Sequence, residues 1–86
     1  MIERFTPSYY QKVMMCNTDI LLEYNRALEK FPPFASRHEG YAILKEELDE
    51  LWDAIKDKKA TDEEIRNEAI QVGAMALRFL VDLHFD

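Results

Sequence analysis

The sequence has few of the residues that constrain a chain by cross-links or by unusual backbone geometry. Its 86 residues include one cysteine (Cys16), two glycines and three prolines. A single cysteine excludes a disulfide within the chain and suits a reducing compartment. No apolar run approaches the roughly 20 residues that span a bilayer, and the first residues do not resemble a signal peptide. We therefore expect a cytoplasmic protein that does not interact with membranes.

Basic residues are also in the minority. Lys and Arg number 11 against 17 Asp and Glu, which gives a formal net charge of −6. This balance argues against binding of a nucleic acid polymer, because phosphate backbones are held mainly by Lys and Arg. A single nucleotide carried by Mg²⁺ is not excluded, since the cation reverses the local charge.

Apolar residues are abundant, at 48% of the chain, which is too many for a disordered protein. A chain of 86 residues is nevertheless short, and a domain of this size buries only a modest fraction of its surface. We expect one domain over residues 1–86 that completes its core by self-association.

Start and stop signals predict three helices and no strands. Thr6 before Pro7 has the form of an N-cap with proline at the first helical position, and the pair Pro32-Pro33 ends that helix. The capping-box pattern occurs twice, at residues 36–39 and 61–64. The connection before the third helix is short, so the second and third helices should pack antiparallel. The fold class is therefore all-α, a three-helix chain forming a helical bundle completed by dimerisation or as a tetramer, with helices over about residues 7–31, 37–58 and 62–84.

Two acidic patterns stand out on the second and third helices. They are Glu46-Glu47-Leu48-Asp49-Glu50 and Glu68-Ala69-Ile70-Gln71. Each places side-chain oxygens at positions i and i+3, which share one face of a helix. On a helical wheel Glu47 and Glu50 lie on one shoulder of the apolar stripe, whereas Glu46 faces solvent. That stripe consists of Tyr41, Leu44, Leu48, Leu51 and Ile55.

The third helix places a glutamate where an apolar residue is expected. Its apolar residues wrap roughly two-thirds of the circumference, wider than the stripe of a surface helix. We expect the second helix to cover one side of it and a second subunit to cover another. Glu68 falls inside this arc, and Arg78 is expected on the polar side, where it can pair with Asp82 one turn later.

Converging carboxylates need a counter-ion. Two of them about 4 Å apart repel by roughly 4 kcal/mol at an effective dielectric constant of 20. No cation of the third helix is expected to reach the shoulder that carries Glu47 and Glu50. Mg²⁺, or Mn²⁺ in its place, accepts oxygen ligands, keeps some of its waters and bridges to phosphates. A solvated acidic face is the alternative, and Glu-Glu-x-x-Glu by itself is not specific.

Glu-Glu-x-x-Glu followed by Glu-x-x-Asp is the signature of the all-α nucleoside triphosphate pyrophosphohydrolases, the MazG-like and dimeric dUTPase-like proteins. This sequence resembles that signature, with Gln71 in place of the last aspartate. The resemblance extends from about Ser36 to Leu83, and short phage and bacterial MazG-like proteins are the most similar. It implies a dimer, or a dimer of dimers, that hydrolyses a nucleoside triphosphate to the monophosphate and pyrophosphate.

The resemblance also implies roles for particular residues. Glu47, Glu50 and Glu68 would be metal ligands, and Glu47 and Glu50 would carry the catalytic role. Gln71 stands where the family has its fourth ligand, an aspartate, and offers a carbonyl oxygen without charge. Candidate substrate contacts are Arg37, His38, Trp52 and Arg78, and base preference is expected to depend on the loop around residues 30–35.

Two other readings stay open at this stage. The chain could be a non-catalytic protein of the same fold that binds nucleotide or metal, or one that only oligomerises. It could also be a helical adaptor whose acidic face meets a basic partner.

Overall fold

The computed structural model describes residues 6–85, and within them the chain is helical with no strand. The helices are α1 (Pro7–Lys30), α2 (Arg37–Lys56) and α3 (Asp62–Asp82). The predicted all-α class is confirmed, and each helix ends one or two residues earlier than predicted. The predicted domain of residues 1–86 includes residues 1–5 and 86, which lie outside the described part.

Each helix begins at the cap that the sequence indicates. The hydroxyls of Thr6, Ser36 and Thr61 accept hydrogen bonds from the backbone N–H three residues later, at 3.3, 3.0 and 3.1 Å. The carboxylate of Glu39 turns back, as in a capping box, but accepts from the N–H of Ala35 at 3.0 Å. At the other end of α1, Phe31 is extended (φ −131°, ψ 138°) because the proline that follows excludes helical geometry.

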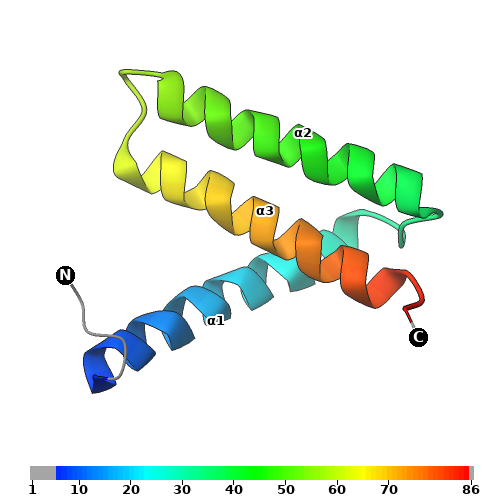
Figure 1. Ribbon diagram of the computed structural model, residues 1–86, viewed down its shortest axis with the longest axis horizontal. Coiled ribbons are helices and arrows are strands. Elements are labelled where there is room, and N and C mark those ends of the chain that lie inside the picture. The colour runs from blue at the N-terminus through cyan, green and yellow to red at the C-terminus, as the bar shows by residue number, and fades with distance from the viewer. Residues whose placement is uncertain (1–5, 86) are drawn as a thin grey trace.

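α3 lies between the other two helices (Figure 1). α2 runs antiparallel beside it, and α1 crosses its other side. Both glycines sit at these contacts. A Cβ on Gly40 would lie 2.6 Å from Cδ2 of Phe79, and a Cβ on Gly73 would lie 3.0 Å from Cδ1 of Ile20. Gly73 thus leaves room for Ile20, and α1 covers a second side of α3.

α2 faces α3 with one edge of the predicted stripe and the acidic shoulder beside it, not with the centre of the stripe. Tyr41, Leu48 and Ile55 of that stripe are exposed, at 63%, 54% and 50%. The wheel assumed that the most apolar face packs inward, but on an adjacent face Gly40 leaves room for the rings of Phe79 and Phe34. The rotation moves one acidic shoulder of α2 against α3. The half-buried residues of α2 are Ile43, Leu44, Glu47, Leu51 and Ala54.

The core is small and lies where the end of α1, the α1–α2 loop and α3 meet. Tyr24, Ile43, Leu44, Phe79 and Leu83 pack around it. Its buried apolar residues are Ala27, Phe34, Ala74 and Met75.

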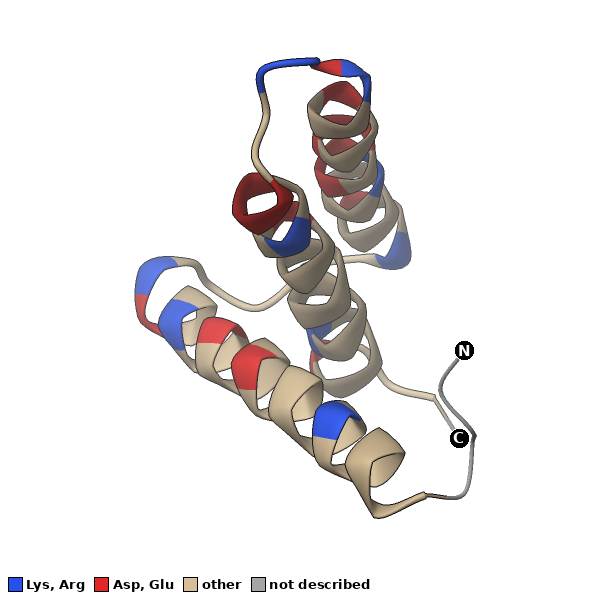
Figure 2. Ribbon diagram, turned by 90° about the vertical axis from the view of Figure 1, so that its left-hand side faces the viewer, with Lys and Arg blue, Asp and Glu red and all other residues tan. Residues whose placement is uncertain are grey.

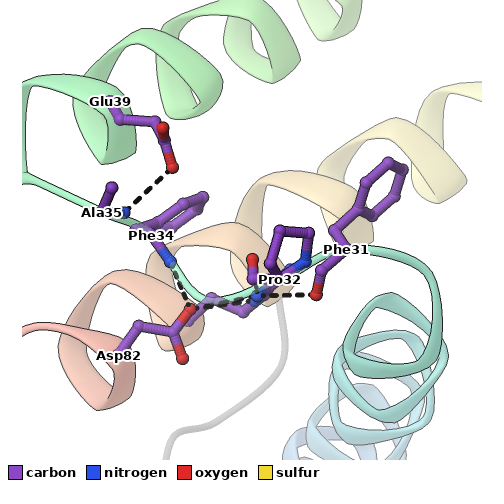
Figure 3. Close-up of polar contacts among 7 residues, drawn as sticks. Phe31, Pro32, Phe34, Ala35, Glu39 and Asp82 are labelled. Atoms are coloured by element: carbon purple, nitrogen blue, oxygen red, sulfur yellow. Dashed lines mark hydrogen bonds and ion pairs between the residues drawn. The ribbon is translucent and has the colours of Figure 1, made fainter.

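A buried ion pair ties the α1–α2 loop to α3. Arg78 was expected on the polar side of its helix, but its side chain is 1% exposed and its predicted partner Asp82 is 6% exposed. The Arg78 guanidinium also donates to the backbone carbonyls of Phe31 and Pro32, at 3.3 and 2.8 Å. Asp82 in turn accepts from the N–H of Phe34 at 3.2 Å (Figure 3). The helical wheel missed this burial because two partners of Arg78 are backbone carbonyls 46 and 47 residues earlier in the sequence.

None of the helices within residues 6–85 is both long enough and apolar enough to cross a membrane.

Candidate metal centre

Residues of all three helices line an open groove with a volume of about 660 Å³. Residues of α1, the α1–α2 loop, α2 and α3 all line it. Acidic segments gather along α2 and at the beginning of α3 (Figure 2). The lining residues are Glu23, Ala27, Lys30, Phe31, Pro32, Phe34, Glu39, Ile43, Glu46, Glu47, Glu50, Glu68, Gln71, Met75 and Arg78.

Three carboxylates converge in this groove. One oxygen from each of Glu47, Glu50 and Glu68 lies within 4.8 Å of the other two. Glu47 and Glu50 are one turn apart on α2, and the antiparallel packing of α3 brings Glu68 opposite them. The structure thus brings together the three glutamates that the spacing singled out, and Gln71 lines the same groove.

The cluster has no ion-pair partner among the described residues. None of the ion pairs within residues 6–85 includes Glu47, Glu50 or Glu68. One oxygen of Glu68, Oε2, is buried and has no hydrogen-bond partner within the described residues. A buried carboxylate oxygen without a partner is costly. Its position beside two further carboxylates fits the oxygen donor set of a hard divalent cation such as Mg²⁺.

The pKa of Glu47 is raised to about 7. Burial is the largest cause, and the negative charges of Glu50 and Glu68 act in the same direction. The ordinary value is 4.5. In the absence of metal the cluster therefore resists full ionisation at neutral pH. A divalent cation among the three carboxylates would reverse this preference, because it favours their charged forms.

The raised pKa predicts how the stability of the metal-free protein depends on pH. The folded state holds a proton on Glu47 up to about pH 7, whereas the unfolded state releases it near 4.5. Stability is therefore greatest below the lower value and falls as pH rises through the window. Allowing for solvent around this half-buried carboxylate, we expect a loss of about 1 kcal/mol, or about 4–8 °C in Tm. Thermal unfolding in chelator should show the fall, and Glu47→Gln should flatten it; an equal fall in that variant would contradict the assignment to Glu47.

Apart from the loop around residues 30–35, which was expected to influence base preference, the remaining residues of the groove were not singled out by sequence reasoning. Glu23, Ala27 and Lys30 lie at positions i, i+4 and i+7 of α1, which is one helical face, but the sequence does not say that this face lines the same groove as the acidic cluster. Glu23 pairs with Arg26 at 2.8 Å. Glu46, expected to face solvent, is exposed and lies at the rim of the groove.

The candidate substrate contacts are dispersed. Arg37 and His38 line a separate shallow hollow with Tyr41 and Phe79, and Arg37 donates to the backbone carbonyl of His84 at 3.2 Å. Trp52 is 56% exposed and does not line the groove.

Arg78 is the one candidate substrate contact that lines the groove, and its guanidinium is committed to Asp82 and the two loop carbonyls. We assign it a structural role in place of substrate contact.

Comparison with family models, with curated proteins and with solved structures found no match to this chain.

Proposed function

We propose that the protein is a Mg²⁺-dependent nucleoside triphosphate pyrophosphohydrolase, which releases a nucleoside monophosphate and pyrophosphate. One observation carries the proposal: three carboxylates converge within 4.8 Å in an open groove, and none of them forms an ion pair within residues 6–85. The groove, at about 660 Å³, is within the range of small-molecule sites. The resemblance of the acidic patterns to the pyrophosphohydrolase signature supplies the reaction class.

The ligand set follows from the cluster. Glu47 and Glu50 from α2 and Glu68 from α3 would hold the metal ion, and Gln71 would offer a neutral oxygen from the next turn of α3. Bound Mg²⁺ supplies positive charge for the phosphate oxygens and lowers the pKa of a coordinated water.

The reaction consumes one water molecule. The water oxygen would attack the α-phosphorus. The α–β anhydride bond would break, and pyrophosphate would leave. Glu47 and Glu50 are the carboxylates assigned to orient this water and to accept its proton. Glu50 is exposed on the groove side, so solvent reaches this end of the cluster.

The proposal is tested by incubating the purified protein with a panel of ribonucleoside and deoxyribonucleoside triphosphates and Mg²⁺. We expect pyrophosphate and the monophosphate as products from at least one of them, and none after chelation of the metal. Folded protein that binds Mg²⁺ and releases pyrophosphate from none of the panel would contradict the enzymatic proposal.

A non-catalytic protein of the same fold is the second candidate, and Gln71 favours it. A neutral amide in place of a carboxylate gives the site one negative charge fewer. For this candidate we expect Mg²⁺ at a hundred times its Kd to raise the free energy of unfolding by about 2.7 kcal/mol, which would be seen as a higher Tm. No nucleotide would be hydrolysed.

We further propose that the chain self-associates in the cytoplasm, at least as a dimer. Of the described residues, four apolar ones are buried, whereas many large apolar side chains on α1 and α2 are exposed. On α2 these include Tyr41, Leu48, Trp52 and Ile55, which follow one side of the helix. Contiguous apolar surface of this kind marks an interface. Light scattering at micromolar concentration should give the mass of a dimer or tetramer, and the mass of one chain would contradict this proposal.

A further inference from the structure

The end of α1 and the residues that follow it line the same groove as the acidic cluster, where they add a cation and apolar side chains. Lys30, Phe31 and Pro32 line this groove together with Glu47, Glu50 and Glu68. We propose that Phe31 is a stacking platform for the nucleobase and that Lys30 contacts the phosphates of the nucleotide. This inference rests on the proposed function, because it takes a metal bound by the glutamates as the anchor for the triphosphate.

The backbone of Phe31 is held firmly. Its N–H donates to the carbonyl of Ala27 at 3.0 Å, and its carbonyl accepts from the buried guanidinium of Arg78. Arg78 also holds the carbonyl of Pro32, and Asp82 fixes Arg78 in turn. An aromatic ring mounted on such a backbone is positioned before a ligand arrives, which lowers the entropy lost on binding.

The ring of Phe31 does not serve the core. Phe31 is 60% exposed, whereas Phe34, three residues later, is 8% exposed and packs under the Arg78 guanidinium. The Phe31 ring points away from the hydrogen-bonded network around Asp82 (Figure 3). A phenyl ring that lines a groove and leaves most of its surface uncovered offers a flat apolar face to a planar ligand.

The charges of the groove single out Lys30. Its lining side chains include six glutamates and two cations, Lys30 and Arg78. Arg78 is paired with buried Asp82, and Lys30 takes part in none of the ion pairs found among residues 6–85. Lys30 is therefore the lining cation left to complement an anion. A polyphosphate, whose charge exceeds what one divalent cation neutralises, fits between the metal and this ammonium group.

The two contacts are separated by measuring dissociation constants for two probes in Mg²⁺. One is an α,β-methylene nucleoside triphosphate, which is not cleaved at that bond, and the other is inorganic tripolyphosphate, which has no base. Phe31→Leu should weaken the nucleotide analogue about tenfold and leave tripolyphosphate unchanged, since stacking on an aromatic ring is lost. Phe31→Trp should retain the affinity, because it keeps an aromatic face at the same exposed position.

Lys30→Gln should weaken both probes about fivefold at low salt and less at high salt, because it removes a screened charge. Lys30→Arg should restore the binding, and Lys12→Gln, an exposed lysine of α1 outside the groove, should have no effect. Thermal unfolding should show that all these variants are folded, as expected for exposed positions.

Each contrary result has a distinct meaning. An unchanged nucleotide affinity in Phe31→Leu overturns the stacking role. If the oligomeric mass of that variant changes while its affinity does not, the ring is an interface contact and the stacking role is overturned as well. Wild-type protein that binds neither probe overturns the inference as well. Binding that depends on Phe31 and Lys30 without release of pyrophosphate defeats the enzymatic function and leaves this inference standing.

Discussion

Replacing Glu68 by glutamine is expected to lower Mg²⁺-dependent pyrophosphate release by at least about 100-fold while making the metal-free protein more stable. Removal of a metal ligand should exceed the roughly 10–100-fold effect of losing a residue that only supports a ligand. The gain in stability has a separate cause. The substitution removes one of three clustered negative charges and a buried carboxylate oxygen that has no partner.

The opposite signs make this variant diagnostic. Steady-state release of pyrophosphate gives the first effect, and Tm in chelator and in Mg²⁺ gives the second. Glu63→Gln, at an exposed glutamate in the first turn of α3, is the control: it should leave pyrophosphate release and the Mg²⁺ effect on Tm unchanged, and should lower Tm slightly because a negative charge is favourable at a helix N-terminus. A helical adaptor with a solvated acidic face predicts a higher Tm for Glu68→Gln and no Mg²⁺ effect in either protein. Equal stabilisation of wild type and Glu68→Gln by Mg²⁺ would contradict the metal site.

Replacing Arg78 by methionine is expected to destabilise the protein by about 3–5 kcal/mol, because it breaks a buried ion pair from one side. Asp82 would remain buried without its counter-charge, and the carbonyls of Phe31 and Pro32 would lose their donor. Since small domains have about 5–15 kcal/mol of total stability, the variant should be close to unfolding at room temperature.

Denaturant unfolding measures this effect, with Arg26→Met as the control. The Arg26 side chain is 62% exposed and pairs with Glu23, which is 14% exposed, at 2.8 Å. Loss of this pair should cost at most about 1 kcal/mol, because the Arg26 guanidinium is open to solvent. Removing both charges, in Arg78→Met with Asp82→Leu, should recover part of the loss. Similar values for the two single arginine variants would show that burial of Arg78 adds nothing to stability.

The sequence predicted the helices and the acidic cluster because both depend on local rules. Caps at Thr6, Ser36 and Thr61 and the proline pair after Phe31 fix the helix ends. The i, i+3 spacing and the short connection between antiparallel neighbours predict that the glutamates of α2 and α3 approach one another. The rotation of α2 that places the shoulder with Glu47 against α3 was not predicted.

The parts that sequence reasoning missed depend on contacts between distant segments. Arg78 is polar on a wheel, and its burial follows from carbonyls 46 and 47 residues away. The side of α2 that packs inward carries Gly40 against the rings of Phe79 and Phe34, and hydrophobic periodicity does not take such a contact into account. Lys30 and Phe31 enter the groove only because α1 crosses α3, and no pattern in the sequence specifies that crossing.

A crystal grown with Mn²⁺ in place of Mg²⁺ would locate the metal by its anomalous scattering. We expect a peak coordinated by carboxylate oxygens of Glu47, Glu50 and Glu68, with Oε2 of Glu68 drawn into contact with the ion or with one of its waters. Glutamate side chains turned into solvent, with no anomalous peak between α2 and α3 at saturating Mn²⁺, would contradict the metal site and the enzymatic function with it.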